Sequence, residues 1–280
     1  MIREAAPAKV NLVLQVGDVR DDGLHELCSL FVSLELADEL TIERLPDGPP
    51  RDRVVCAGVE GPNLATRALE ELRAELRGDL PPLAVTIHKR IPVAAGLGGG
   101  SADAAAVLRA ANRIAGSPLD ADALRAIGAR LGADVPSQIE PRHALVTGAG
   151  EHVDPVALPD AALVLIPQSE GLSTADVYRT ADQIRSTRAR LDPDALRALA
   201  AASLPDLARA LQNDLEPAAL ELRPELRGVL EELQGAGALA ARITGSGPTA
   251  FGVFADRSAA VAAAAGLSSD SIVTALRQHP

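Results

Sequence analysis

Apolar and polar residues follow two different spacings along the first half of the chain. Strict alternation is typical of a half-buried strand, and apolar residues three or four apart are typical of a helix packed on a core. On this basis we expect strands at residues 10–16, 27–36, 40–44, 54–59 and 83–89. We expect helices at residues 64–77, with Asn63 as N-cap, at 102–114, and at 120–131, where the pattern stops at Gly132.

The pattern restarts beyond Pro155. Here we expect strands at residues 161–166, 239–244, 250–254 and 271–276, and helices at 174–191, 194–211, 224–234 and from Ser258 onward. Strands and helices that are grouped, without strict βαβ alternation, favour an α+β fold in which each sheet is covered on one face. A length of 280 residues is typical of two domains, and we predict them at residues 1–156 and 157–280.

Composition and charge narrow the class of protein. The apolar fraction is 47%, but aromatic residues make up only 1%, so we expect a core of Ala, Leu, Val and Ile. A net charge of −11 and the absence of Trp argue against a nucleic-acid partner. No stretch reaches the roughly 18–20 apolar residues of a membrane span, and Met1 leads directly into Arg3 and Glu4. We therefore expect a cytoplasmic protein without membrane contact, in which Cys28 and Cys56 are reduced.

A glycine-rich segment, Gly96-Leu-Gly-Gly-Gly-Ser-Ala102, leads directly into the helix expected at 102–114. Glycines let backbone N–H groups approach a ligand, and the start of a helix adds unpaired donors and partial positive charge. The segment therefore predicts an anion site that suits phosphate. We expect Ser101 to be the N-cap, where its hydroxyl caps the helix or contacts a phosphate or metal. The alternative is a helix-entry loop without a ligand.

Other phosphate-binding motifs do not account for this segment. No Gly-Lys pair occurs, which excludes the P-loop, and the H-R-D and D-F-G motifs of protein kinases are absent. The segment Gly245-x-Gly247-x-x-Ala250 matches a relaxed dinucleotide fingerprint. The run from Phe251 to Phe254 predicts a strand after it, however, where that fingerprint requires a helix.

Three motifs in order along the chain resemble those of the GHMP small-molecule kinases. They are Ala6-Pro-Ala-Lys-Val-Asn-Leu12, Pro92-x-x-x-Gly96-Leu-Gly-Gly-Gly-Ser-Ala102 and Gly245-Ser-Gly-Pro-Thr249. Within that superfamily the chain is most similar to the 4-diphosphocytidyl-2-C-methyl-D-erythritol kinases, on the stretches Asp22-Gly-Leu-His-Glu-Leu27, Gly132-Ala-Asp-Val-Pro136 and Asn213-Asp-Leu-Glu216.

The resemblance implies a ribosomal-protein-S5-like N-terminal domain, a ferredoxin-like C-terminal domain and an active site in the cleft between them. It implies ATP- and Mg²⁺-dependent phosphorylation of the 2-hydroxyl of a cytidine diphosphate-linked polyol, in the non-mevalonate (MEP) pathway to isoprenoids. The alternatives are another GHMP kinase, acting on a sugar, homoserine or a mevalonate-type alcohol, or a non-catalytic nucleotide-binding protein of this fold. A monomer and a weak dimer are both open.

The resemblance also implies residue roles. Asp134 would accept the hydroxyl proton, with Lys9 keeping it ionised; a weak base suffices because a loose transition state releases the proton late. The alternative for Asp134 is a helix cap. The expected ATP-binding residues are Pro92, Val93, Ala94, Ala95, Gly96, Leu97, Gly98, Gly99, Gly100, Ser101, Ala102, Asn63 and Asn112, although both asparagines are also plausible caps. The expected substrate-binding residues are Asn11, Leu24, His25, Tyr178, Gly245, Ser246 and Gly247.

Two departures from the family pattern stand out. The family usually has Tyr, which stacks on cytosine, where this chain has Leu24, so the base would lose one aromatic face. Tyr178 aligns with the aromatic residue on the other face of the base. The family also usually continues with Phe and a Gly pair where this chain has residues 137–142, which changes the loop after Asp134. His25 would read the edge of the cytosine, unless it is a surface-loop histidine.

Overall fold

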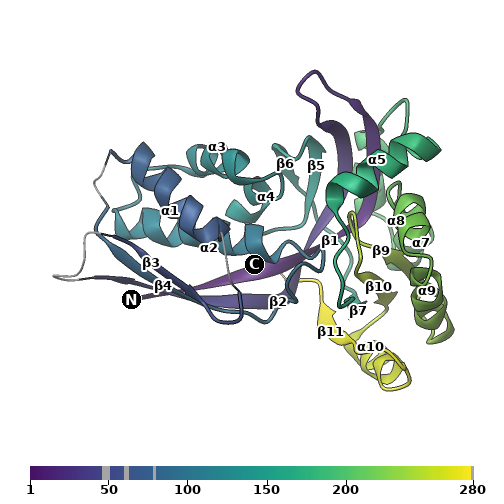
Figure 1. Ribbon diagram of the computed structural model, residues 1–280. Helices are drawn as coiled ribbons and strands as arrows, with labels where there is room; N and C mark the ends of the chain where they lie inside the picture. Colours follow the sequence, from purple (N-terminus) through teal and green to yellow (C-terminus); the bar gives the residue numbers. More distant parts are fainter. Residues whose placement is uncertain (46–50, 60–62, 78–79, 279–280) are drawn as a thin grey trace. The chain divides into compact units, whose positions relative to one another are not determined.

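The computed structural model describes residues 1–45, 51–59, 63–77 and 80–278. The chain forms two compact units, each assembled from separate segments of the sequence (Figure 1). The first unit comprises Met1–Ala8, Leu36–Val93 and Gly98–Pro141, and the second comprises Lys9–Glu35, Ala94–Leu97 and Arg142–Pro280. The two domains that we expected at residues 1–156 and 157–280 stay a prediction.

Two long strands, β1 (Ile2–Val19) and β2 (His25–Arg44), are neighbours in a seven-stranded sheet and contribute to both units. We predicted two strands, at 27–36 and 40–44, where the structure has the single strand β2. The polar residue that interrupts the sequence pattern, Asp38, is fully buried, and its carboxylate accepts hydrogen bonds from the backbone N–H groups of Arg90 and Ile91. A satisfied buried carboxylate therefore replaces an apolar residue without ending the strand.

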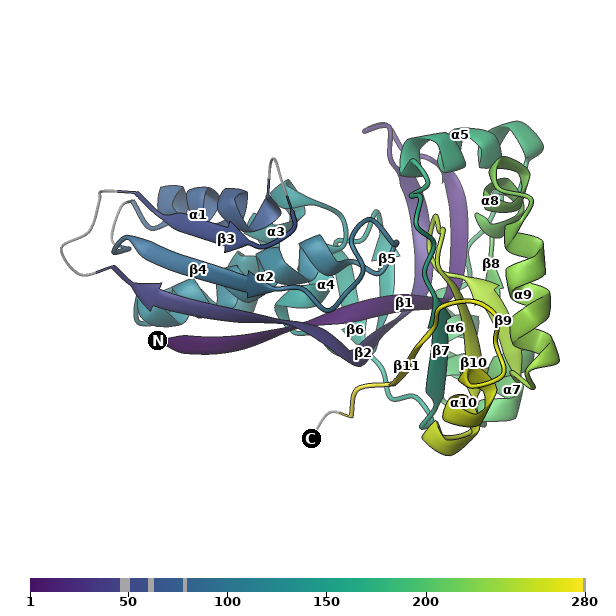
Figure 2. The ribbon, with the colours of Figure 1, turned by 60° about the horizontal axis from the view of Figure 1, so that its bottom comes forward.

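In the first unit, β3 (Arg53–Cys56) and β4 (Leu83–His88) extend the sheet in the order β3-β4-β2-β1. The helices α1 (Leu64–Glu75), α2 (Gly99–Ile114), α3 (Ala121–Leu131) and α4 (Val135–Ile139) cover one face of it (Figure 2). Asn63 caps α1 as predicted, its Oδ1 accepting a hydrogen bond from the Ala65 N–H. The core is rich in alanine, since α2 buries Ala102, Ala104–Ala106, Ala110 and Ala111. These small side chains let α2 pack closely against its neighbours.

In the second unit, β5 (Ala144–Gly148) pairs with β2 and with β6 (His152–Pro155), and β8 (Gln212–Asn213) pairs with β1. A separate four-stranded sheet has the order β11-β7-β10-β9. Its strands are β7 (Ala162–Ile166), β9 (Ala240–Ile243), β10 (Ala250–Phe254) and β11 (Ile272–Ala275). Helices α9 (Leu226–Gly235) and α10 (Arg257–Ala264) pack against this sheet. The remaining helices are α5 (Thr174–Ile184), α6 (Pro193–Ala200), α7 (Leu204–Arg209) and α8 (Glu216–Leu222).

Two helix predictions in this unit were wrong in length. The helix predicted at 174–191 ends at Ile184, because Arg185 takes a left-handed conformation and the Arg188 N–H then donates to Val16 O of β1. The helix predicted at 194–211 is two helices, because Ser203 is extended and caps α7, which has a proline in its first turn. Strands β5, β6 and β8 and helices α4 and α8 were not predicted. Within the described ranges, none of the helices combines the length and apolar character needed to span a bilayer.

Candidate active site

The glycine-rich segment opens α2 without a side-chain cap. Helix α2 begins at Gly99, and its N-cap is Gly98, which has φ 70° and makes no side-chain hydrogen bond to the helix. The prediction that Ser101 is the N-cap was therefore wrong: the left-handed Gly98 starts the helix earlier and places Ser101 in its first turn. The first-turn N–H groups of a helix have no intrahelical acceptor, so this uncapped start has the donors that an anion site requires.

Residues 94–97 of the glycine-rich segment belong to the second unit and contact the C-terminal glycine turn, residues 245–249. Gly96 has φ 76°, and a Cβ at this position would overlap the carbonyl oxygen of Gly247. Thr249 Oγ1 donates to Ala95 O at 2.6 Å, and the Lys9 N–H donates to Leu97 O at 3.0 Å. Residues 94–97, the turn at 245–249 and strand β1 are therefore in direct contact.

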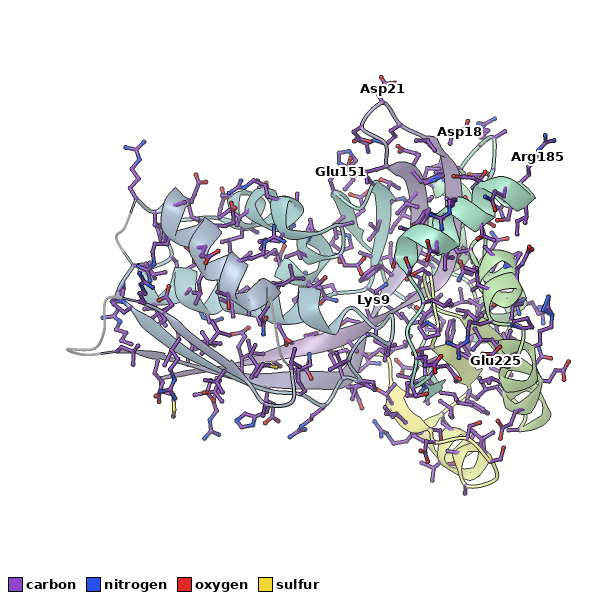
Figure 3. The ribbon with its side chains drawn as sticks, viewed as in Figure 1. Lys9, Asp18, Asp21, Glu151, Arg185 and Glu225 are labelled. Atoms are coloured by element: carbon purple, nitrogen blue, oxygen red, sulfur yellow. The ribbon has the colours of Figure 1, made fainter. Side chains whose placement is uncertain are left out.

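Lys9 is held in a buried polar site near the middle of β1 (Figure 3). It is only 5% exposed; its Nζ donates to Asn11 Oδ1 at 2.9 Å and lies 5.1 Å from the centre of the Phe31 ring. Asn11 in turn donates through Nδ2 to Ser29 Oγ at 2.8 Å. Buried cations are found where their charge is compensated or used. The arrangement therefore fixes the direction in which the ammonium group points.

The turn at Gly245 approaches the same two side chains. A Cβ at Gly245, which has φ 56°, would lie 3.3 Å from Asn11 Oδ1 and 3.5 Å from Lys9 Nζ. The structure thus brings together Lys9, Asn11 and Gly245, all of which we predicted as site residues. Ser246 follows Gly245 in the sequence, and its Oγ lies 3.0 Å from Thr174 Oγ1.

Asp134 belongs to the first unit and precedes α4. It occupies the N-cap position of α4, but its side chain makes no capping hydrogen bond to that helix, and its backbone carbonyl accepts a hydrogen bond from Ser137 Oγ at 2.8 Å. This differs from Asp120 and Asn63, whose side chains cap α3 and α1. Asp134 thus stands at the N-cap position of a helix, but its carboxylate does not cap that helix.

His25 and Tyr178 contact each other in the second unit. Their ring centres are 5.0 Å apart and tilted by 35°. His25 Nδ1 lies 2.9 Å from Gly17 O, and since a carbonyl only accepts, Nδ1 carries the proton. Nε2 lies 3.4 Å from Asp182 Oδ2. Leu24, by contrast, is 53% exposed in the turn between β1 and β2.

Sequence reasoning gave no role to Asn213-Asp-Leu-Glu216, which it used only to mark the resemblance. Asn213 Nδ2 donates to Ile243 O and Gly245 O, both at 2.8 Å. Glu216 accepts from the Ile243 N–H at 2.8 Å, and Asp214 accepts from the Val16 N–H at 3.0 Å. The stretch therefore holds the C-terminal glycine turn and β1 in place. No local pattern signals this, since the partners lie far away in sequence.

The two candidate adenine-binding asparagines have structural partners. The Asn63 side chain caps α1, and Asn112 binds the backbone of Leu119 through both ends, with Nδ2 2.8 Å from Leu119 O. Their contact with adenine stays a prediction. Sequence reasoning also missed a buried ionic cluster of Asp38, Lys89 and Asp103 in the first unit.

Two family models match the sequence of the chain. Residues 63–140 match the family model "GHMP kinases N terminal domain", and residues 195–271 match "GHMP kinases C terminal". The chain is 40% identical over 277 residues to a 4-diphosphocytidyl-2-C-methyl-D-erythritol kinase of Rhizobium johnstonii, an alignment that covers 95% of this chain and 88% of the relative. The chain belongs to the GHMP kinases. A relative of the same name from Geobacter sulfurreducens is 43% identical, with 92% of each chain covered.

Solved structures agree with this GHMP kinase assignment. A crystal structure of a 4-(cytidine 5'-diphospho)-2C-methyl-D-erythritol kinase matches with a TM-score of 0.82 and 33% identity over 99% of this chain and 100% of that one. A homoserine kinase from Cytophaga hutchinsonii matches with a TM-score of 0.74 at 21% identity, which shows the shared fold. The α+β fold class, the GHMP kinase resemblance and the small-molecule kinase class are therefore confirmed, with ATP as the phosphate donor that the kinase family implies.

Proposed function

We propose that this GHMP kinase transfers the γ-phosphoryl group of ATP to the 2-hydroxyl of 4-diphosphocytidyl-2-C-methyl-D-erythritol, a step of the non-mevalonate route to isoprenoids, in the cytoplasm. The observation that carries the proposal is the 40% identity to relatives of that name over nearly the whole chain. The buried Lys9–Asn11 pair, the uncapped start of α2 and the contact of His25 with Tyr178 support it.

In this proposal Asp134 accepts the proton of the attacking hydroxyl and Lys9 polarises that hydroxyl. The carboxylate of Asp134 does not cap α4. A carboxylate is a weak base, but a loose phosphoryl-transfer transition state requires little proton transfer before the phosphorus–oxygen bond breaks. Positioning and charge then carry most of the catalysis, and Lys9 is suited to this because Asn11 fixes its ammonium group.

Residues 92–102 would bind the ATP phosphates through backbone N–H groups at the start of α2, and Asn63 and Asn112 would contact the adenine. Magnesium offsets phosphate charge in such reactions and is held mainly by phosphate oxygens and water. Within the described part of the chain, no group of three or more His, Cys, Asp or Glu side chains is placed to hold a metal. The hydroxyl of Ser101, in the first turn of α2, is the side-chain ligand we propose.

The cytidine end of the substrate would lie against His25, Tyr178 and Leu24. His25 would form a hydrogen bond with the edge of the cytosine that bears the exocyclic amine, where uracil has a carbonyl. Tyr178 offers one aromatic face, and Leu24 offers an apolar contact on the other. Asn11 would contact the methylerythritol portion, and Gly245, Ser246 and Gly247 would border the diphosphate or ribose.

A coupled ADP-release assay tests the proposal. The full chain is given Mg-ATP with 4-diphosphocytidyl-2-C-methyl-D-erythritol, and in parallel with galactose, homoserine and mevalonate. We expect turnover with the cytidine-linked substrate alone. Turnover with another of these alcohols, and none with the cytidine-linked one, would show that the proposed substrate is wrong, while the assignment to the GHMP kinases would stand. Nucleotide binding without any turnover would favour a non-catalytic role.

A further inference from the structure

Arg20 closes the turn between β1 and β2 in the second unit. It follows the last residue of β1, and its backbone N–H donates to Leu24 O at 2.7 Å. The Leu24 N–H in turn donates to Asp22 Oδ1 at 3.0 Å. The turn ends at His25, the first residue of β2. The shape of this turn therefore sets where Leu24 and His25 lie.

The guanidinium group of Arg20 lies among three carboxylates. Its Nη1 donates to Glu151 Oε1 at 2.7 Å and lies 3.7 Å from Glu26 Oε2, and its Nη2 lies 3.1 Å from Asp22 Oδ2. Glu151 is 131 residues further along the chain, in the turn between β5 and β6 (Figure 3). Because β5 pairs with β2, the two turns belong to neighbouring strands. Arg20 therefore joins the β1–β2 turn to the β5–β6 turn.

Glu151 is fixed by its own turn in the position that receives Arg20. Its Oε2 accepts from the Ala149 N–H at 2.5 Å. Gly148, with φ 74°, leaves room for the carboxylate, since a Cβ there would lie 2.6 Å from Glu151 Oε1. Partial burial raises the pKa of Glu151, but the hydrogen bonds from Arg20 and from backbone N–H groups outweigh it, so the pKa lies below its ordinary value. Glu151 is therefore an ionised acceptor at neutral pH.

The turn that Arg20 closes leads into the contact between His25 and Tyr178. The ring centres of these two residues are 5.0 Å apart. The side chains of Arg20 and Glu151 are 33% and 36% exposed, and ion pairs exposed to this extent contribute little to overall stability. Loss of the pair should therefore change the turn more than the fold, and with it the position of His25 on Tyr178.

We propose that Arg20 and Glu151 form a positioning pair that sets the affinity for the cytidine end of the substrate, because it holds the turn that carries Leu24 and His25. The inference rests on the proposed function, in which Leu24, His25 and Tyr178 contact the cytosine. The pair acts through the turn and has no part in binding ATP. Its loss should therefore weaken the binding of one substrate only.

A double-mutant cycle in steady-state kinetics tests the pair. KM and kcat of the full chain are compared with those of Arg20→Gln, Glu151→Gln and the double variant, with the cytidine-linked substrate and ATP varied in turn. The matched control is Asp21→Asn, which removes an exposed carboxylate from the β1–β2 turn (Figure 3). If Arg20→Gln fails to fold, Arg20→Lys takes its place in the cycle, since one ammonium group cannot reproduce the fork that binds Glu151 and Asp22.

We expect KM for the cytidine-linked substrate to rise by about 3- to 10-fold in each single variant, since charge-assisted hydrogen bonds are stronger than neutral ones. The double variant should show the same rise as a single variant, because either substitution already breaks the contact. KM for ATP and kcat should stay within about twofold of wild type in all variants, as should every constant of Asp21→Asn. Additive effects in the double variant, an equal rise in KM for ATP, or an unchanged KM for the cytidine-linked substrate would overturn the inference.

Tyr178 supplies a readout that needs no substrate. It is the only tyrosine of a chain without tryptophan, so the tyrosine emission of the protein comes from this ring. We expect acrylamide to quench this emission more strongly in Arg20→Gln and Glu151→Gln than in the wild type and Asp21→Asn, because His25 no longer covers the ring. Equal quenching in all four proteins would overturn the inference while leaving the proposed function intact. A wild type that does not phosphorylate the cytidine-linked substrate would overturn the proposed function, and the inference with it.

Discussion

Gly96→Ala changes the point at which the glycine loop meets the C-terminal glycine turn. Gly96 has φ 76°, and an added Cβ would overlap Gly247 O and lie 3.1 Å from Gly247 C. Both neighbours are backbone atoms, so no side chain can rotate away to relieve the contact. We expect the loop and the turn to move apart, which would disturb the Thr249–Ala95 and Lys9–Leu97 hydrogen bonds.

The size of the effect follows from two separate contributions. An alanine in the left-handed region costs about 1–2 kcal/mol relative to glycine. Overpacking at a site that must shift adds about 1–3 kcal/mol. The free energy of unfolding of the second unit should therefore fall by about 2–5 kcal/mol. The same displacement would misplace the N–H groups of residues 96–98, so affinity for ATP should fall as well.

Gly237→Ala is the matched control. Gly237 also lies in the second unit and has φ 91°, but a Cβ there would meet nothing within 4 Å. It isolates the conformational contribution, so urea denaturation of both variants should give a larger loss for Gly96→Ala by at least about 1 kcal/mol. Titration with Mg-ATP should show weaker binding for Gly96→Ala alone. Equal losses of stability and unchanged binding in both variants would refute the reasoning about the contact between loop and turn.

Three further predictions follow from the site. Asp134→Asn should lower kcat by about 10²- to 10⁴-fold. The control Asp120→Asn keeps a good N-cap on α3 and should leave kcat unchanged. A kcat of Asp134→Asn within about threefold of wild type would exclude the proton-acceptor role. Leu24→Tyr should lower KM for the cytidine-linked substrate, since stacking contributes about 1–3 kcal/mol, without changing KM for ATP; an unchanged KM for the cytidine-linked substrate would contradict the base contact. Burial raises the pKa of Asp103 from 3.8 to about 7 in the folded protein, so its contribution to the free energy of unfolding should be fully present below about pH 4 and lost as the pH rises through 7. This contribution is at most about 4 kcal/mol. If Asp103→Asn showed the same dependence of stability on pH as the wild type, the prediction would be contradicted.

The elements that were predicted well have local causes. Strand β10 coincides with the predicted range 250–254, because its apolar run is bounded by the glycine turn on one side and by Asp256, the N-cap of α10, on the other. Asn63 and Asp120 cap α1 and α3, where their short side chains reach the first N–H groups. The glycine-rich entry to α2 was likewise predictable from the backbone chemistry of glycine, while phosphate binding there stays a prediction.

The features that were missed depend on contacts between distant segments. Asp38 interrupts the pattern of β2 in the sequence, yet it is a strand residue because the N–H groups of Arg90 and Ile91 satisfy it. The roles of Asn213 and Glu216 depend on backbone atoms of Ile243 and Gly245. The N-cap was misplaced from Gly98 to Ser101 because capping preference favours serine, while the left-handed Gly98 decides where the helix begins.

The regiochemistry of the product tests the central claim most directly. In 2-C-methyl-D-erythritol, the second carbon bears the methyl group and no hydrogen, so a phosphate on its oxygen has no proton three bonds away. We predict that a proton-coupled ³¹P spectrum of the product from Mg-ATP and 4-diphosphocytidyl-2-C-methyl-D-erythritol shows the new phosphomonoester as an unsplit line. A doublet or triplet would place the phosphate on a secondary or primary hydroxyl, and the absence of a new phosphomonoester would mean that this substrate is not phosphorylated; either result would contradict the account.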